Sequence, residues 1–500
     1  MKRKFLFFSV ILVFFSTCLL MLGASQSRAA TPDQIEAAID RGIAYLATQQ
    51  NPDGSWGGWE QVAYTGFAVL KMEDRAYELY GDPLAEEFAY HANIVAGLRY
   101  ICSQVQADGS FYVPAQGNHH ANYNTSLAIM ALTASRHPEL MCSDPTTYLQ
   151  VVQNAVRYLL AGQNANGGWG YNIENGGPTP TWDWADNSNS GYVTMALVYA
   201  SRLFGVDIAA ALPSLNNWID FIQTDVTGGP NDGGSGYTMS GEWVNILKTG
   251  NLLFQMAMLG DTTAIQRAKD AIAYIARHWN DANTDPGFRN HYQSMFAMMK
   301  GLESLGVATI DVGGTDVDWF AEVSDIIVTT QNADGSWPPG DWGDSVLNTS
   351  WTLLTLERVV ESPRLKVAVD IKPGSCPNPY NSKSLGVIPA AILGSTDFDV
   401  STIDPATVRL TMEDMAGVAP VRWNFEDVAT PFAGELCDCH DLNGDGFPDM
   451  TLKFDNQAVE AALDLSGQAG TTVPLTITGN LLEEFNNRPF SGKDCMRILK

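Results

Sequence analysis

Basic residues are scarce in this sequence. Its 500 residues include 29 Lys and Arg against 56 Asp and Glu, which gives a formal net charge of −27 at pH 7. A surface this acidic repels the phosphates of nucleic acids and anionic lipid headgroups. It also disfavours a substrate that carries a diphosphate. We therefore expect no nucleic-acid partner.

Long hydrophobic runs are also rare. The one run that approaches membrane-spanning length, Phe5–Leu22, follows three basic residues at positions 2–4 and precedes a small-residue cleavage motif at 27–29. This order is typical of a Sec-type signal peptide, which we predict over residues 1–29; an uncleaved membrane anchor is the alternative. We expect a protein that is secreted, periplasmic or held at the cell surface, with no stable membrane span after signal cleavage.

Cysteine is limited to seven residues, six of which follow the signal peptide. Two of these six lie in the first part of the chain and four in the last part: Cys102 and Cys142, then Cys376, Cys437, Cys439 and Cys495. Even numbers in each region of an exported chain indicate disulfides. Cys437 and Cys439 are too close along the chain to pair comfortably, so we expect each to reach Cys376 or Cys495. A zinc site in "CDCH", Cys437–His440, is the alternative.

A glycine-rich turn, in contrast, recurs along the sequence. "QNPDGSW" at Gln50–Trp56, "QNANGGW" at Gln163–Trp169 and "QNADGSW" at Gln331–Trp337 are close copies, and Val105–Phe111 is a weaker one. Asp or Asn before Gly is typical of a tight turn in which Gly takes a positive φ. Six apolar runs, each opened by a small hydroxyl or amide residue, begin at residues 65, 125, 190, 249, 293 and 349.

Amphipathic helical patterns precede these turns, for example at Ala37–Gln50, Val151–Gln163 and Ala268–Trp279. Each repeat therefore predicts an outer helix with one solvent-exposed face, a turn, and an inner helix buried on most sides. We expect the Thr or Ser at the start of each apolar run to be a helix N-cap, and the Gln of each turn to bond the neighbouring helix pair. Six such pairs can close into a ring, whereas an open solenoid is the alternative.

These turns resemble the Gln-Trp repeats of the squalene cyclase and prenyltransferase superfamily. The resemblance covers roughly residues 31–362 and implies an all-α six-fold α/α toroid, six helices inside six, with ligands in its central cavity. The family's catalytic signatures are missing: neither Asp-x-Asp-Asp nor Asp-Cys-Thr-Ala-Glu occurs. Where zinc prenyltransferases place a Cys and a His ligand, this sequence has Ser188 and Asn348. We therefore expect no zinc in the toroid.

Polar and aromatic residues gather near the predicted starts of the inner helices. Asp183 and Asp186, in "TWDWADNSN", are the candidate catalytic pair, because a carboxylic acid shielded by Trp182 and Trp184 would have a raised pKa and could donate a proton. The other candidate cavity residues are His119, His120, Asn124, Asn189, Asn348 and Trp342, with Lys248, Trp243 and His291 at comparable places. Aromatic faces with carboxylates suit a cationic transition state or stacked sugar rings.

The pattern changes after residue 362. Short β-prone runs between Gly, Pro and Asp turns predict an antiparallel β-sandwich domain over residues 363–500; the runs are Leu365–Ile371, Leu385–Leu393, Ala406–Met412, Asp449–Phe454 and Val473–Gly479. This part resembles a C-terminal module of bacterial extracellular proteins that opens "DIKPGS". Its "DLNGDGFPD" loop predicts a structural calcium site whose ligands are Asp441, Asn443, Asp445, the Phe447 carbonyl and Asp449.

Three functions remain open at this point. The first is an exported cyclase-like toroid that binds or acts on a small molecule in its cavity. The second is an extracellular carbohydrate-active or carbohydrate-binding toroid, and the third is a non-catalytic surface protein. A dry, apolar cavity would favour the first, a wet groove with paired carboxylates the second, and a plugged cavity the third. The sequence does not decide whether the chain is an enzyme.

Overall fold

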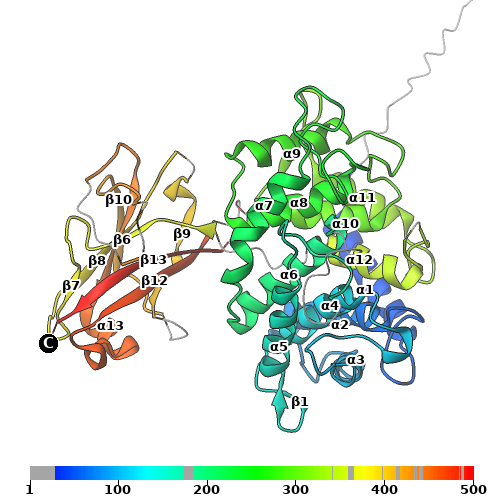
Figure 1. The fold of residues 1–500 in the computed structure, drawn as a ribbon, viewed down its shortest axis with the longest axis horizontal. Coiled ribbons are helices and arrows are strands. Elements are labelled where there is room, and N and C mark those ends of the chain that lie inside the picture. Colours follow the sequence, from blue (N-terminus) through cyan, green and yellow to red (C-terminus); the bar gives the residue numbers. More distant parts are fainter. Residues whose placement is uncertain are drawn as a thin grey trace, which may run out of the picture.

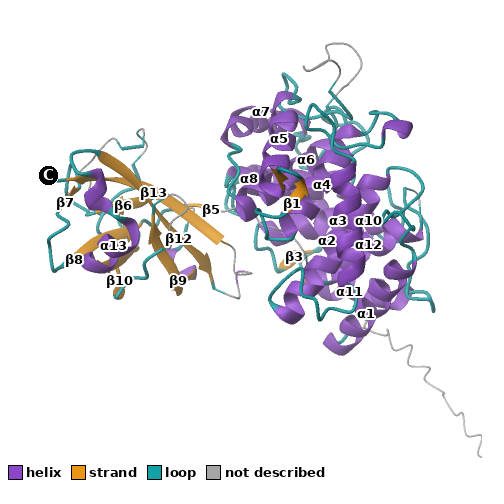
Figure 2. Cartoon of the chain, turned by 90° about the horizontal axis from the view of Figure 1, so that it is seen from below, coloured by secondary structure: helices purple, strands orange, loops and turns teal. Residues whose placement is uncertain are grey.

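The computed structural model describes residues 29–173, 185–340, 342–358, 365–396, 398–412, 417–432, 434, 436–437, 443–482, 485 and 489–499. The predicted signal peptide lies outside these residues except for Ala29. Helices α1 to α12 gather in one body and strands β5 to β13 in another (Figures 1 and 2). Within the described part of the chain, every helix is too short or too polar to cross a membrane.

The helices of the first body alternate between an outer and an inner set. The outer set is α1 (Pro32–Thr48), α3 (His91–Ser103), α5 (Tyr148–Ala161), α7 (Leu212–Ile222), α9 (Gln266–Arg277) and α11 (Trp319–Thr330). The inner set is α2 (Gln61–Tyr80), α4 (Ala121–Ala134), α6 (Asn187–Phe204), α8 (Ile246–Leu259), α10 (Tyr292–Ser304) and α12 (Ser345–Leu356). The six predicted apolar runs all lie in the inner helices, whose side chains are buried nearly all round.

The inner helices contact one another in a closed circuit. Helix α2 contacts α4, and the contacts continue through α6, α8 and α10 to α12, which contacts α2 again. The outer helices pack against the outside of this circuit, for example α3 on α2, α5 on α4 and α9 on α8. Because each outer helix has only one apolar stripe, it buries that stripe against the inner helices and leaves its other face in solvent.

The repeated Gln joins each turn to the next helix pair. The Nε2 of Gln50 donates to the carbonyl of Gly54 in its own turn and to that of Asn93, at 3.0 Å each. The Nε2 of Gln163 does the same with Gly167 and Ala211, at 2.8 and 3.1 Å. The repeated Trp closes the turn over its own outer helix, since Trp56 Nε1 donates to the Leu46 carbonyl at 2.7 Å. Sequence copies thus make the same contacts at the first and third junctions.

The turn glycine allows two backbones to meet at each junction. Gly54 has a φ of +92°, and a Cβ built on it would lie 2.5 Å from the carbonyl oxygen of Ala96 in the next outer helix. Any side chain at this position would strain the turn and push the helices apart. The positive φ that the sequence predicts is therefore present, and it serves close packing as well as the turn.

The predicted N-caps are wrong. Thr65, Thr125 and Thr349 lie inside α2, α4 and α12, and the N-caps of the inner helices are instead residues such as Asp186, Asn245 and Asp344. Each threonine hydroxyl accepts the backbone N–H of the aromatic residue in the preceding turn, at 3.0, 2.9 and 3.1 Å for Trp56, Phe111 and Trp337. The hydroxyl is therefore used to bind the turn to the inner helix.

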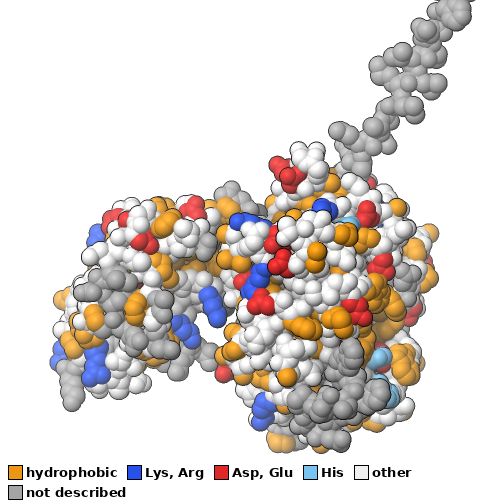
Figure 3. All heavy atoms as spheres, turned by 45° about the horizontal axis from the view of Figure 1, so that its top comes forward, with side chains coloured by type: hydrophobic (Ala, Val, Ile, Leu, Met, Phe, Trp, Pro, Cys, Tyr) orange, Lys and Arg blue, Asp and Glu red, His pale blue; other side chains and the backbone are white. Residues whose placement is uncertain are grey.

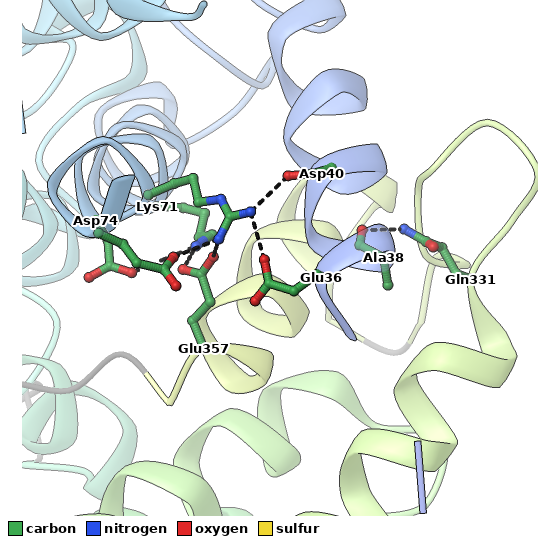
Figure 4. A network of polar contacts seen from close by, with 9 residues as sticks. Glu36, Ala38, Asp40, Lys71, Asp74, Gln331 and Glu357 are labelled. Carbon is green, nitrogen blue, oxygen red and sulfur yellow. Dashed lines mark hydrogen bonds and ion pairs between the residues drawn. The ribbon is translucent and has the colours of Figure 1, made fainter. Parts of the chain in front are cut away.

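The last repeat is joined to the first. Gln331, which follows α11, donates from Nε2 to the carbonyl of Ala38 in α1 at 2.8 Å and to that of Gly335 at 3.0 Å. Close by, Arg75 of α2 pairs with Glu36 and Asp40 of α1, and the buried Lys71 pairs with Glu357 just after α12 (Figure 4). Contacts of the same kind as those between successive repeats therefore connect the two ends of the helical body.

The second body contains two sheets. One has the strand order β10 (Arg422–Glu426), β11 (Asp449–Asp455), β8 (Val387–Ile392), β6 (Val369–Ile371). The other has the order β5 (Leu365–Lys366), β13 (Pro489–Ile498), β12 (Thr472–Leu481), β9 (Ile403–Thr411), with β7 (Pro379–Tyr380) also on β13. Ile388 and Leu452 of the first sheet share one buried cluster with Leu410 and Ile477 of the second. The pairing is antiparallel except where β13 meets β5 and β7, which are parallel to it.

Disulfides occur in both bodies. Cys102 pairs with Cys142, and Cys437 pairs with Cys495. Cys376 is also in a disulfide, whereas Cys439 lies outside the described residues. The disulfide at Cys437 rules out the alternative in which this residue is a zinc ligand.

Candidate functional site

A central cavity opens where the inner helices begin. Its volume is about 520 Å³, which is within the usual range for a small-molecule site. All six inner helices or the turns before them contribute to its lining, for example Phe67, Leu127, Tyr192, Lys248, Gln293 and Trp351. Because each inner helix starts at the same end of the circuit, the first turns of all six meet around one space.

The deeper wall of the cavity is aromatic and aliphatic. Phe67 contacts Tyr192 and Trp351 edge to face, with ring centroids 5.7 and 6.1 Å apart, and Leu127 and Leu347 complete this wall. Trp351 Nε1 donates to the Tyr192 hydroxyl at 3.2 Å, so the two polar groups here satisfy each other. The deep wall therefore offers a ligand chiefly apolar and aromatic surface.

The outer end, which we call the mouth, carries three exposed tryptophans, Trp59, Trp243 and Trp342. Trp243 and Trp342 meet edge to face, with ring centroids 6.2 Å apart. Trp342 is one of the predicted cavity residues. Indole rings at a mouth offer flat faces on which an apolar molecule or a sugar ring can stack.

One side of the mouth holds a glutamate–histidine pair. Glu60 Oε1 lies 2.7 Å from His120 Nδ1, and Glu60 Oε2 accepts from Asn124 Nδ2. Asn124 Oδ1 in turn accepts the backbone N–H of Ala63 at 3.0 Å, and so caps α2 from the neighbouring helix. With Nδ1 held by the carboxylate, His120 is oriented as in catalytic acid–base pairs, and its Nε2 is the atom that can meet a ligand.

The backbone at Glu60 adopts an unusual conformation. Its φ and ψ are 49° and 43°, in the left-handed region that non-glycine residues seldom occupy. Such a conformation costs on the order of 1 kcal/mol or more, and such residues cluster at functional sites. Here it turns the Glu60 carboxylate toward His120, which is at the start of the adjacent inner helix.

The opposite side of the mouth holds an aspartate and a lysine. Asp285 accepts from Trp243 Nε1 at 2.8 Å and from Asn245 Nδ2 at 2.6 Å. The amine of Lys248 lies 3.8 Å from the centroid of the Trp243 ring and 5.7 Å from that of Tyr237. Lys248 is only 2% exposed, and this burial lowers the pKa of its amine to about 7, although Asp285, Glu242 and Asp186 act in the opposite direction.

The predicted catalytic aspartates are placed as follows. Asp183 and its neighbours Trp182 and Trp184 lie outside the described residues. Asp186 is buried and is the N-cap of α6: it accepts from Asn189 N at 2.9 Å, from Asn189 Nδ2 at 2.7 Å and from Ser188 Oγ at 2.5 Å. Burial raises its pKa to about 6 against these hydrogen bonds. Ser188 lines the cavity, whereas Asp186 does not and is connected to it through the hydroxyl of Ser188.

The remaining predicted cavity residues divide into two groups. His120 and Trp342 line the cavity, and His119 is exposed just outside it. Asn124, Asn189 and Asn348 lie inside the helices and make structural hydrogen bonds, such as that from Asn348 Nδ2 to the Pro338 carbonyl at 2.7 Å. The sequence reading missed Glu60 and Asp285, because neither belongs to a repeated pattern.

The calcium loop is only partly described. Asp441 lies outside the described residues, and Asn443, Asp445 and Phe447 are at or near the surface. Asp449 is buried, and its two oxygens accept the backbone N–H groups of Gly394, Val428 and Ala429. Asp427, which the sequence prediction did not include, accepts the N–H groups of Asp445 and Gly446 at 2.9 and 2.8 Å. Its carboxylate therefore lies against the loop.

Charged side chains lie scattered among uncharged ones on the face of the molecule seen in Figure 3. Elsewhere in the helical body, basic groups pair with acidic ones, as Arg267 does with Asp261 and Asp220. On the face seen in Figure 3, acidic and basic side chains are mixed and spread among uncharged ones.

Comparison with known proteins gives a partial match. No protein-family model matches the chain. Over 146 residues it is 24% identical to a lanosterol synthase of Aspergillus fumigatus; this stretch covers 27% of the chain and 17% of that enzyme's length. The match confirms the resemblance to the squalene cyclase superfamily that the Gln-Trp repeats indicate.

Several solved structures are similar to this one. A type II terpene cyclase, MstE, from Scytonema is 15% identical, with 65% of this chain and 98% of that chain covered and a TM-score of 0.41. An α-1,6-mannanase of Salegentibacter is 11% identical, with 65% and 98% covered and a TM-score of 0.45. An unsaturated glucuronyl hydrolase specific for heparin is 14% identical, with 66% and 97% covered and a TM-score of 0.44.

Proposed function

We propose that the chain is an exported protein that binds a small, largely apolar molecule in the central cavity of a six-fold α/α toroid. The observation that carries this proposal is the deep aromatic wall formed by Phe67, Tyr192 and Trp351 below a polar mouth. Burial of apolar ligand surface is worth about 25 cal/mol per Å², so such a wall favours a hydrocarbon or aromatic body. A cavity of about 520 Å³ also argues against a plugged toroid.

The mouth supports acid–base chemistry on that ligand. We assign the role to Glu60 and His120, whose hydrogen bond orients the imidazole beside the cavity. A positioned acid or base contributes about 10²- to 10⁴-fold to a rate. The predicted role of Asp183 and Asp186 stays a second proposal, in which the buried Asp186, with a pKa raised to about 6, supplies a proton through Ser188.

The ligand itself is the first thing to identify. The full-length protein is purified from its own host, extracted with organic solvent, and the extract is analysed by mass spectrometry. We expect one small molecule per protein chain, and its loss in the Leu347→Trp variant, which fills the cavity. Leu385→Trp, at a site that is 87% exposed in the second body, is the matched control and should keep the molecule. An empty cavity in the unaltered protein that also takes up no added apolar ligand would refute the proposal.

If the bound molecule is converted during incubation, Glu60→Gln and His120→Gln should each slow the conversion by about 100-fold or more while binding persists. A rate unaffected by both variants would remove the pair from the mechanism. The same assay on Asp186→Asn tests the second proposal.

A carbohydrate ligand is the second candidate. It is favoured by the exposed Trp59, Trp243 and Trp342 together with the carboxylates of Glu60 and Asp285 at the mouth. Sugar rings stack on indole faces and hydrogen-bond to carboxylates. Quenching of tryptophan fluorescence by oligosaccharides, without quenching by apolar molecules, would favour this function over the first.

For the second body we propose a β-sandwich module, residues 363–500, that holds a structural calcium ion. Asp441, Asn443, Asp445 and the Phe447 carbonyl remain the proposed ligands, and Asp427 holds the loop backbone beside them through the N–H groups of Asp445 and Gly446. The Asp449 oxygens already accept backbone N–H groups, so that residue's part is to fix the end of the loop. Oxygen ligands of this kind suit calcium, which accepts six to eight of them.

A further inference from the structure

The two carboxylates that line the mouth both have partners for each of their oxygens. Glu60 is bonded to His120 and Asn124, and Asp285 is bonded to Trp243 and Asn245. Each of these four oxygens therefore already has one hydrogen-bond partner within the protein. These hydrogen bonds fix the positions of the residues that form the mouth.

Lys248 is the exception among the charged groups of the mouth. Its side chain lines the cavity and is almost fully buried, yet its amine makes no hydrogen bond or ion pair with any described residue. The amine lies over the face of the Trp243 ring, 3.8 Å from its centroid. A buried amine without a partner is costly to keep charged, and burial correspondingly lowers its pKa to about 7.

The surroundings of this amine favour a neutral electrophile over an anion. Asp285, Glu242 and Asp186 are the acidic groups that act on it, so a ligand carboxylate or phosphate would face a surplus of negative charge. Many of the residues that line the cavity with Lys248 are aromatic, and Lys248 itself is only 2% exposed. A desolvated lysine in an apolar pocket is the arrangement in which proteins form Schiff bases with carbonyl compounds.

We propose that Lys248 forms an imine with an apolar aldehyde or ketone bound in the central cavity; this inference rests on the proposed binding function. The lone pair of Nζ attacks the carbonyl carbon, and the carbonyl oxygen takes up a proton, which gives a carbinolamine. Loss of one water molecule then forms the C=N bond. Amine and carbonyl thus give imine and water, with no oxidant or reductant required. Asp285 is the acidic group with the largest electrostatic effect on the amine.

Reductive trapping tests the proposal directly. Full-length protein is incubated at pH 7 with 4-butylbenzaldehyde and sodium cyanoborohydride, and the modified lysines are identified by peptide mass spectrometry. We expect Lys248 to be modified at least tenfold faster than the exposed lysines. Lys300 is the internal control: it is equally buried, and burial also lowers its pKa to about 7, but it does not line the cavity and should stay unmodified. Modification of Lys300 at the same rate would show that a low pKa alone is responsible, and would overturn the proposal.

Two variants and one analogue separate this inference from the proposed function. Lys248→Arg should give no fast adduct, and Leu347→Trp should slow the adduct at Lys248 by about tenfold or more by filling the cavity. The alcohol 4-butylbenzyl alcohol, which cannot form an imine, should still quench tryptophan fluorescence in the Lys248→Arg variant. In the unaltered protein, binding of the alcohol without an adduct from the aldehyde would overturn the imine and leave the binding function intact. If neither compound binds, both the imine proposal and the proposed binding function are refuted.

Discussion

Gln331 offers the sharpest test of whether the helical body is a closed ring. In an open solenoid the last turn would have no further helix pair to bond, so replacing its Gln would cost little. In the structure, Gln331 Nε2 donates to the Ala38 and Gly335 carbonyls at 2.8 and 3.0 Å. Each such bond contributes about 0.5–1.5 kcal/mol, so Gln331→Ala should lower the free energy of unfolding by about 2 kcal/mol.

The measurement is urea unfolding followed by circular dichroism at 222 nm, which reports chiefly on the helical body. With a slope of about 3 kcal/mol per molar urea, the midpoint should fall by about 0.7 M. Gln163→Ala, which removes the equivalent pair of bonds at 2.8 and 3.1 Å from an internal junction, should give the same shift. Gln49→Ala, at an exposed residue whose side-chain amide donates only to Thr48, is the matched control and should be nearly neutral. A Gln331→Ala midpoint equal to that of the control would refute the closed ring.

Three further predictions concern other parts of the chain. Burial raises the pKa of Asp186 from 3.8 to about 6, so the folded state holds this proton more tightly than the unfolded state, and stability is lost as pH rises through that window. Asp186→Asn should therefore gain about 2 kcal/mol relative to the parent between about pH 4.5 and 7.5. Equal differences in urea midpoint at both pH values would contradict this. Replacing Cys102 and Cys142 by Ser opens a loop of 40 residues and should cost about 2–4 kcal/mol, measured by unfolding with the parent under oxidising conditions as reference. Calcium at about 1 mM should raise the melting temperature of the second body in calorimetry of the full chain, and Asp445→Ala should abolish this rise. Identical melting curves in calcium and in chelator would refute the proposed calcium site.

The repeats made most of the helical body predictable from sequence. Each copy of the turn is local, and the Gln, Gly and Trp at Gln50–Trp56 or Gln331–Trp337 specify contacts that recur wherever the copy is complete. The starts of the inner helices were placed a few residues too late. The reason is physical: the hydroxyl of Thr65 resembles an N-cap in sequence, whereas in the fold it accepts from the backbone of the preceding turn.

The site was less predictable, because its key residues do not repeat. Glu60 follows a turn as one of several polar residues, and nothing local shows that its backbone is left-handed or that its carboxylate reaches a histidine 60 positions later. Lys248 was noted only for its place near an inner helix start. In the second body, β13 was missed because Pro489–Ile498 mixes charged and small residues, and its burial depends on strands β12 and β5 at its sides.

The contacts of Arg75 have a consequence for the covalent chain itself. Its guanidinium lies 2.7 Å from Glu36, near the start of the helical body, and 4.0 Å from Glu357, at its end (Figure 4). The peptide could therefore be joined across this gap and opened at another turn, since the Gln331 bonds that close the two ends match those of Gln50 and Gln163 at internal junctions. Such a circular permutant would keep the cavity while moving both chain ends, and with them the second body, to another point on the circumference.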